Sequence, residues 1–235
     1  MRAVGFSYHD TAEFFDDALA ACDWDFVQLQ LNYADWELMD VKALYRKAAA
    51  RGLRVFVMEP LRGGLLANPP AAVRQILQKA APDASPAQWA LRWLMGLEQV
   101  QLVLSGASSL AQWVENTRLF AAHQPLSHAG QAALAQAVQV LAEAIAVPCT
   151  GCGYCSACPK GIEIDSCFEA YNILRAYEAP AEALRRYLRL PEDRRAGSCI
   201  RCGKCQEHCP QHIAIPEKLA ELSRAFARLE EEHPC

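Results

Sequence analysis

Short apolar runs alternate along residues 1–122 with longer segments in which apolar residues recur every three or four positions. This alternation predicts strands and helices in turn, which is typical of βα units built around a parallel sheet. The predicted strands cover residues 3–6, 26–31, 55–58 and 101–104. The predicted helices cover residues 11–21, 40–51, 71–81, 86–95, 109–121 and 130–146.

A polar or glycine-rich segment follows each predicted strand, in the order GFSYHD, LNYAD, EPLRGG and SGASS. In a barrel of βα units such loops gather at one end and build the functional site. Gly106 and Ser108 lie where a predicted helix begins, and phosphate groups bind readily at helix starts. Each loop taken alone is equally compatible with an ordinary turn or cap.

The composition excludes some classes of partner. The chain has 235 residues, of which 52% are apolar and 21% are charged, with a net charge of −4. An acidic balance argues against nucleic acid as a partner, because nucleic-acid-binding proteins usually present a basic surface. No apolar run is long enough for a membrane span, and the first residues lack a signal-peptide pattern. We therefore predict a cytoplasmic protein with no membrane or nucleic-acid partner.

The distribution of cysteine divides the chain. All of the eleven cysteines except Cys22 lie between residues 149 and 235. Such crowding in a cytoplasmic chain indicates a metal centre rather than disulfides. We predict two domains, at residues 1–146 and 147–235.

Eight of these cysteines form two runs, each followed by proline: Cys149, Cys152, Cys155 and Cys158, then Cys199, Cys202, Cys205 and Cys209. The second run has the C-x2-C-x2-C-x3-C-P spacing of bacterial ferredoxins, which hold 4Fe-4S clusters. The segments CPKGIEI and CPQHIAI repeat at an offset of 51 residues. The pattern predicts two 4Fe-4S clusters. In two-cluster ferredoxins the fourth cysteine of each run binds the other cluster, which predicts that Cys209 joins the first run and Cys158 joins the second.

Other interpretations of the cysteines stay open. Zinc sites use pairs of C-x2-C, which would leave the third and fourth cysteine of each run without a role. The first run is one residue shorter than the second, which leaves room for a single cluster or for altered ligation. Helical patterns at residues 168–178, 181–190 and 216–232 predict a mostly helical two-cluster domain.

The four loops, taken together and in order, resemble the second half of the aldo/keto reductase barrel over residues 1–122. The matching segments are GFS, DFVQLQLNY, MEPLRGGLL and SGASSLAQWVEN. The resemblance implies the second half of a TIM-type barrel, with about four βα units that bind a nicotinamide cofactor. It places Ser7 and Gln28 at the nicotinamide carboxamide, Gly63 and Gly64 on the phosphate side, and Glu115 and Asn116 at the adenine.

Two departures from the family limit what the resemblance implies. Where the family often has a lysine and an arginine for the 2′-phosphate of NADP, this chain has Gly106 and Gln112, so NADP and NAD both stay open. The family's catalytic Asp, Tyr, Lys and His come from strands outside this chain, and we assign no catalytic residue. We expect a fragment of a longer reductase, or a half barrel completed by another subunit or a second copy.

The tail resembles that of aldo/keto reductases with a C-terminal iron–sulfur domain. The resemblance implies nicotinamide-dependent carbonyl or alcohol chemistry, with clusters that pass single electrons to or from a redox protein or a small carbonyl substrate. The alternative is a non-enzymatic electron-transfer module that uses the half barrel as a docking platform. The expected fold class is α/β plus α.

Overall fold

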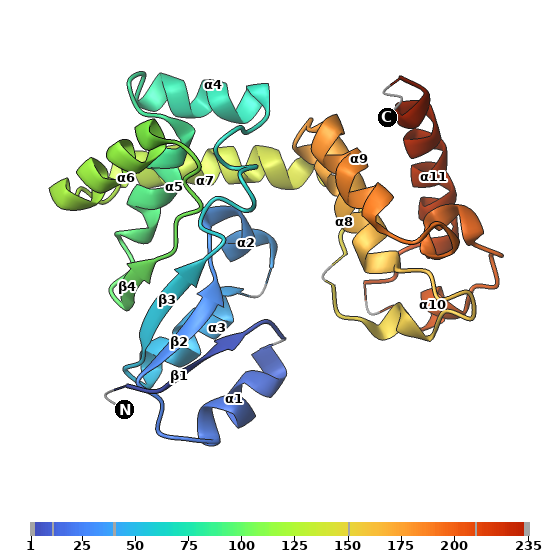
Figure 1. The fold of residues 1–235 in the computed structure, drawn as a ribbon, viewed down its shortest axis with the longest axis horizontal. Coiled ribbons are helices and arrows are strands. Elements are labelled where there is room, and N and C mark those ends of the chain that lie inside the picture. Colours follow the sequence, from blue (N-terminus) through green and yellow to red (C-terminus); the bar gives the residue numbers. More distant parts are fainter. Residues whose placement is uncertain (1–2, 11, 40, 150, 210, 233–235) are drawn as a thin grey trace. The chain divides into compact units, whose positions relative to one another are not determined.

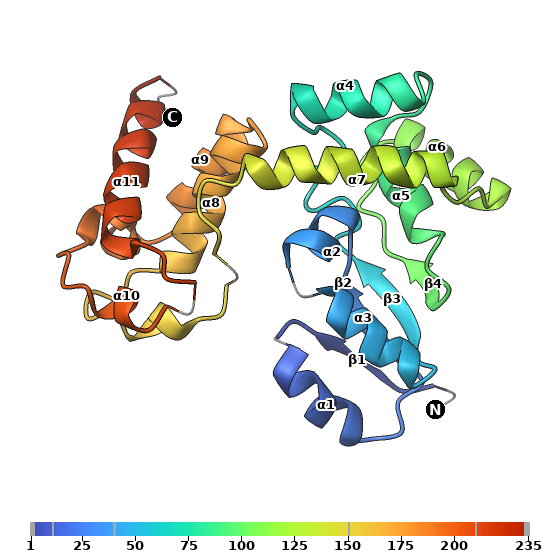
Figure 2. The same ribbon diagram turned by 180° about the vertical axis from the view of Figure 1, so that it is seen from behind.

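The structure is a computed structural model that describes residues 3–232, apart from residues 11, 40, 150 and 210. Clustering of contacts divides the chain into two compact units, Met1–Leu141 and Ala142–Cys235. Figures 1 and 2 show both units from opposite sides. Within the described residues, no helix is both long and apolar enough to cross a membrane.

The first unit contains a parallel sheet of four strands in sequential order (Figure 1). The strands are β1 (Gly5–Tyr8), β2 (Phe26–Gln30), β3 (Arg54–Met58) and β4 (Val100–Val103). Each strand overlaps one of the four predicted from the apolar runs. Because the order is sequential, β1 and β4 form the two edges of this sheet.

Helices connect the strands, as the periodic segments predict. They are α1 (Ala12–Ala20), α2 (Tyr33–Leu38), α3 (Val41–Ala50), α4 (Ala71–Ala80), α5 (Pro86–Leu94), α6 (Leu110–Ala122) and α7 (His128–Glu143). Helix α2 was not predicted, since LNYAD was taken for a loop. It forms because the Asn32 side chain caps it, accepting hydrogen bonds from the amides of Ala34 and Asp35 at 3.1 and 2.8 Å. A helix of six residues is too short to show a periodicity.

The two faces of the sheet differ in burial. Alternate strand residues point to opposite faces, and Val27, Leu29, Val55 and Val57 on one face are at most 1% exposed. They pack into a core with residues of α1 and α3, including Phe15, Leu19 and Leu44. This core holds the sheet against its helices and fixes the register of the strands.

The opposite face carries residues that the register places side by side. Ser7 pairs with Gln28, Gln28 with Phe56, and Phe56 with Leu102. Ser7 and Leu102 are exposed, and Gln28 and Phe56 are half-buried. The rings of Phe26 and Phe56 stack on this face, with centroids 4.3 Å apart. This face corresponds to the interior of the predicted barrel.

The second unit is built from helices and short 3-10 turns (Figure 2). The elements are η1 (Tyr154–Ala157), α8 (Ile164–Ala176), α9 (Pro180–Arg189), η2 (Glu192–Arg194), η3 (Ala196–Ser198), α10 (Lys204–Glu207) and α11 (Ile215–Glu232). Helices α8, α9 and α11 lie at the three segments where periodicity predicts them. Phe168 and Phe226 are buried between these helices, and the ring of Phe226 stacks on Tyr187 with centroids 4.0 Å apart.

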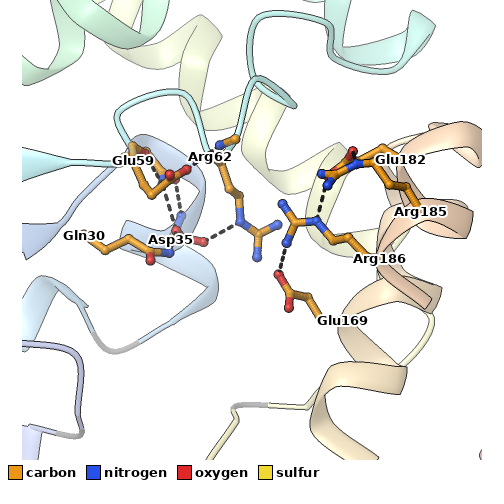
Figure 3. A network of polar contacts seen from close by, with 10 residues as sticks. Gln30, Asp35, Glu59, Arg62, Glu169, Glu182, Arg185 and Arg186 are labelled. Carbon is orange, nitrogen blue, oxygen red and sulfur yellow. Dashed lines mark hydrogen bonds and ion pairs between the residues drawn. The ribbon is translucent and has the colours of Figure 1, made fainter. Parts of the chain in front are cut away.

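Ion pairs and a hydrogen bond join the helices of this unit. Glu182 accepts from both Arg185 and Arg186 on α9, and Arg186 also donates to Glu169 on α8 (Figure 3). The hydroxyl of Tyr171 on α8 donates to Glu221 on α11 at 2.7 Å. Both contacts fix α8 against its neighbours.

The sequence repeat is also a repeat of backbone conformation. Helix α8 begins at Ile164 and α11 at Ile215, which match at the offset of 51 residues. Three pairs of matched positions have a left-handed backbone: Gly151 and Arg201, Gly153 and Gly203, and Gly161 and His212. Each half of the unit therefore consists of a cysteine run, a left-handed turn and a helix.

Candidate functional site

The first cavity of the second unit is lined by cysteines from both runs. Cys149, Cys152 and Cys155 of the first run line it together with Cys209 of the second. The structure therefore brings together the first set of four cysteines that the spacing predicts.

The second cavity has the reciprocal composition. It is lined by Cys158 of the first run and by Cys199, Cys202 and Cys205 of the second. Each cavity therefore takes three cysteines from one run and the fourth from the other.

Apolar side chains form most of the remaining walls. Phe168, Ile213 and Ile215 line the first cavity, and they are at most 7% exposed. Ile162, Ile164 and Leu219 line the second cavity and are also buried. A dry wall of this kind tunes the potential of a metal centre. Ile200 also lines the second cavity, although its side chain is 57% exposed.

The backbone directs amides toward the first cysteine of each run. The amide of Arg201 donates to Sγ of Cys199 at 3.4 Å. At the matching position, a hydrogen bond from the Gly151 amide lowers the pKa of Cys149, against a larger increase caused by burial. Amide–sulfur bonds of this kind stabilise thiolates that bind iron.

Burial sets the ionisation of these thiols in the absence of metal. Burial raises the pKa of Cys155 to about 11, and the negative charge of Asp165 adds to the increase. Burial likewise raises the pKa of Cys205, and Cys158 and Cys199 contribute further. These thiols are protonated at neutral pH without metal, and metal binding would displace their protons.

The geometry of the cysteines suits a cluster of several metal atoms. Four cysteines line each of the two cavities. A four-iron cube fits this arrangement because it takes one thiolate at each of four separate irons.

Two further described cysteines line neither cavity. Cys167 is fully buried in α8, and burial raises the pKa of its thiol to about 12. Cys22 is exposed in the first unit. Neither belongs to the two runs, and the same is true of Cys235, which lies outside the described residues.

In the first unit, Ser7 and Gln28 lie side by side on the interior-type face of the sheet. The side-chain amide of Gln28 donates to Sδ of Met58 at 3.5 Å, a weak contact that holds the side chain across β3. The strand register therefore brings together the two residues that the resemblance places at a carboxamide.

A polar network joins the loops after β2 and β3 (Figure 3). Asp35 is fully buried, and its carboxylate accepts from Gln30 and Asn32 at 2.9 and 2.7 Å. Its other oxygen pairs with Arg62 Nε at 2.9 Å. The sequence patterns do not predict this pair, although LNYAD contains one acidic residue, Asp35, and EPLRGG contains one basic residue, Arg62.

In the same network, the amide of Gly63, which is predicted to bind phosphate, already has a hydrogen-bond partner. The amide of Gly63 donates to the carboxylate of Glu59, and the backbone oxygen of Glu59 accepts from Asn32 at 3.1 Å. Gly63 and Gly64 both have a left-handed backbone, with φ of 63° and 91°. A carboxylate of this chain thus lies where the anion of a ligand is expected.

The residues predicted after β4 lie at the start of α6 and along it. Gly106 and Ser108 are exposed, and the amide of Ser108 donates to Gln112 at 2.9 Å. Asn116 donates to Oγ of Ser105 at 3.0 Å. Glu115 accepts from Ser85 and Gln88. These four hydrogen bonds fix the side chains of Gln112, Asn116 and Glu115.

An open groove runs beside Glu115. It is lined by Gln88, Leu110, Ala111, Val114, Glu115, Arg118 and Leu119 of α5 and α6. Helix α6 contains no buried residue. The groove combines an apolar wall with one carboxylate and one guanidinium.

Two family profiles match different parts of the chain. The sequence profile of the aldo/keto reductase family matches residues 1–138, and the profile of a 4Fe-4S dicluster domain matches residues 148–214. The comparison with curated proteins gives no match.

Solved structures similar to the chain include aldo-keto reductases. One is the holo form of AKR11C1 from Bacillus halodurans, with 20% identity, 58% of this chain and 50% of that chain covered, and a TM-score of 0.48. Another is a thermostable reductase, Tm1743, in complex with the inhibitor epalrestat, with 21% identity, 58% and 48% coverage, and a TM-score of 0.48. The chain spans about half the length of these two proteins.

The family profile covers more than half of the chain, and the second profile coincides with the unit that contains the two cysteine-lined cavities. The chain belongs to the aldo/keto reductase family and carries a 4Fe-4S dicluster domain.

Proposed function

We propose that the second unit holds two 4Fe-4S clusters and serves a nicotinamide-dependent oxidoreductase as its one-electron carrier. The observation that supports this most strongly is the presence of four cysteines around each of two cavities. Cys149, Cys152, Cys155 and Cys209 would bind one cluster; Cys158, Cys199, Cys202 and Cys205 would bind the other. Each cluster supplies one-electron transfer when it is bound.

For the first unit, we propose that it contributes half of a nicotinamide-binding barrel. Ser7 and Gln28 would orient the carboxamide, because a hydroxyl and a side-chain amide offer both donors and acceptors to it. Gly63, Gly64, Gly106 and Ser108 would face the phosphates of NADP or NAD. Glu115 and Asn116 would contact the adenine.

Cofactor binding at the loop after β3 requires one local change. The Gly63 amide must release the carboxylate of Glu59 before it can donate to a phosphate. The negative charge of Glu59 opposes that of the phosphate, so its side chain would turn away on binding. Arg62 would remain beside Asp35, where it fixes the shape of the loop.

The chain does not supply the whole reaction in this proposal. It spans about half the length of the reductases named above, and we assign it no catalytic residue. The remaining barrel half, from a longer chain or another subunit, or self-association would complete the site for a small carbonyl or alcohol substrate.

A second function is supported by the completeness of the cluster unit. All eight cysteines that would bind iron lie within one compact unit of this chain. That unit could exchange electrons with a redox partner protein while the half barrel acts as a docking platform. Binding of nicotinamide cofactor separates the two functions, because only the reductase requires it.

The cluster proposal is tested by anaerobic purification, with iron and acid-labile sulfide measured in the full chain. We expect a brown protein whose broad visible absorbance decreases on addition of dithionite. Cys209→Ser should lower the iron content by about half, since it removes one of four ligands from one cluster. Cys22→Ser is the matched control and should leave it unchanged. A colourless protein with stoichiometric zinc would contradict the proposal.

The nicotinamide proposal is tested by titrating NADPH and NADH into the reductase with its complete barrel. We expect saturable binding of at least one of the two cofactors. Gln28→Ala should weaken that binding by about tenfold, the cost of one or two lost hydrogen bonds. Gln75→Ala, at an exposed position of α4, should have no effect. Failure of both cofactors to bind would refute the assignment.

A further inference from the structure

The two halves of the repeat differ in the charges that they place at the two cavities. Most positions that line one cavity have a matched position lining the other, at an offset of 50 or 51 residues. In two pairs that line both cavities, a charged residue is matched with an uncharged one: Asp165 with Pro216, and Lys160 with Gln211. Arg201 also lines the second cavity, and its counterpart Gly151 carries no charge. The two proposed clusters would therefore have similar ligands but different electrostatic surroundings.

The first cavity has a negative neighbour. Asp165 is the charged residue among those that line it, and the others are cysteine, glycine, aromatic, isoleucine and glutamine side chains. Asp165 lies in the first turn of α8. Asp165 therefore places a negative charge in the same cavity lining as Cys149, Cys152, Cys155 and Cys209.

The second cavity has positive neighbours. Lys160 and Arg201 line it, and its lining includes no carboxylate among the described residues. Arg201 lies between Cys199 and Cys202, and its amide donates to the sulfur of Cys199. Nearby Glu163 is paired with Arg194 at 3.3 Å, which offsets its charge.

The effect of these charges on a cluster has a definite sign. Reduction adds one negative charge to a cluster, so a nearby cation favours the reduced form and a nearby anion disfavours it. Part of the effect is screened because Asp165, Lys160 and Arg201 are exposed. The remaining effects lower the reduction potential of a cluster in the first cavity and raise that of a cluster in the second. They therefore increase the difference between the two potentials.

We propose that Asp165 lowers the reduction potential of the cluster bound by Cys149, Cys152, Cys155 and Cys209, while Lys160 and Arg201 raise that of the other. This inference rests on the proposed function, since it requires a cluster in each cavity. One electron supplied to the pair then passes from the first cluster, which is oxidised, to the second, which is reduced. No proton or ligand is transferred.

The test is a potentiometric titration of the full, cluster-loaded chain with dithionite, followed by electron paramagnetic resonance. Wild-type protein should show two midpoints. Replacing the cations by their counterparts in the repeat, in the double variant Lys160→Gln with Arg201→Gly, should lower the higher midpoint and leave the lower one in place. Asp165→Asn should raise only the lower midpoint. Gln211→Lys, which adds a cation to the first cavity, should also raise the lower midpoint.

We expect the double variant to change the equilibrium constant for electron exchange between the clusters by about tenfold, which is about 59 mV for one electron. Arg189→Gln and Asp193→Asn remove the same charges from exposed positions that line neither cavity. Both midpoints should stay unchanged in these controls.

The outcomes separate this inference from the proposed function. A chain without iron would refute the clusters themselves. About eight irons per chain with a single shared midpoint, or midpoints that the cavity variants move no more than the controls do, would leave the clusters standing and overturn the charge asymmetry. If Asp165→Asn raised the higher midpoint and left the lower one in place, the assignment of the two midpoints to the two cavities would be reversed. That result would also overturn the inference.

Discussion

The cysteine loops show how single residues set the shape of the cluster unit. Where the first half of the repeat has Gly151 and Gly161, the second half has Arg201 and His212 in the same left-handed conformation. This conformation costs a residue with a Cβ atom about 1–2 kcal/mol, whereas glycine adopts it freely. The second half therefore carries backbone strain that the first half avoids.

Exchanging residues between the halves should exchange this strain. His212→Gly should stabilise the cluster-loaded chain by about 0.5–1 kcal/mol, the relieved strain less the greater freedom of glycine in the unfolded chain. Gly161→Ala should destabilise it by about 1 kcal/mol, and nothing within 4 Å of its Cβ would add a clash. Anaerobic thermal unfolding measures both changes. His212→Ala is the control and should give no gain, and equal stability of all three variants would contradict the prediction.

The buried carboxylate of Asp35 is stabilised by its ion pair with Arg62. Arg62→Met leaves this fully buried charge without its cation, which should cost about 3 kcal/mol. Asp35→Asn in the Arg62→Met background should recover part of the loss, because a neutral amide needs no counter-charge. Urea unfolding of the four proteins in a double-mutant cycle measures the coupling. Additive effects of the two substitutions would show that the pair is not coupled.

At the scale of elements, the periodicity of the sequence predicts most of the structure. The four strands and the long helices lie within a few residues of the predicted positions, because each buries an apolar face with the period of its own backbone. The spacing of the cysteines likewise predicts which four meet around each cavity. Local patterns carry this information because the sulfurs of each run lie within one turn of chain.

What the sequence did not predict depends on contacts between distant segments. Helix α2 forms through a side-chain cap at Asn32 and not through periodicity. The contact of Asp35 with Arg62 joins α2 to the loop after β3, and neither segment alone indicates it. The opposite charges at the two cavities depend on which residues line each one. Spacing alone does not indicate this, because each cavity is lined by residues from both halves of the repeat.

The contact between α8 and α11 gives the cluster unit a pH dependence. Burial, with a smaller contribution from Glu221, raises the pKa of Tyr171 to about 12. A raised pKa means that the contact stabilises the protonated phenol fully below about pH 10, and that this stability is lost as the pH rises toward 12. Tyr171→Phe should therefore cost about 1 kcal/mol at pH 8.

The difference in the free energy of unfolding between Tyr171→Phe and wild type should shrink between about pH 10 and 12. Chemical denaturation of the cluster-loaded chain at several pH values measures it. Tyr154→Phe, at an exposed position of η1, is the control and should track wild type throughout. A difference that stays constant up to pH 12 would contradict the assignment of the hydrogen bond.

At the scale of the whole molecule, the two units differ in how complete they are. The sheet of the first unit ends in two edge strands, β1 and β4, and Leu102 and Leu104 beside the interior-type face are 40% and 45% exposed. Parallel sheets are normally covered on both faces. The second unit, by contrast, gathers each set of four cysteines around its own cavity.

The exchange of the fourth cysteine between the runs has a consequence for assembly. A cluster bound by Cys149, Cys152, Cys155 and Cys209 would tie both runs together, and would fix Cys158 and Cys205 close to the positions that the other cluster needs. Binding of the first cluster then supplies the free energy that orders both cysteine runs. The second cluster should therefore bind more tightly than the first. With iron and sulfide supplied at half of the full amount, native mass spectrometry should show empty and fully loaded chains, with few that hold one cluster. A random distribution would mean that the two sites fill independently.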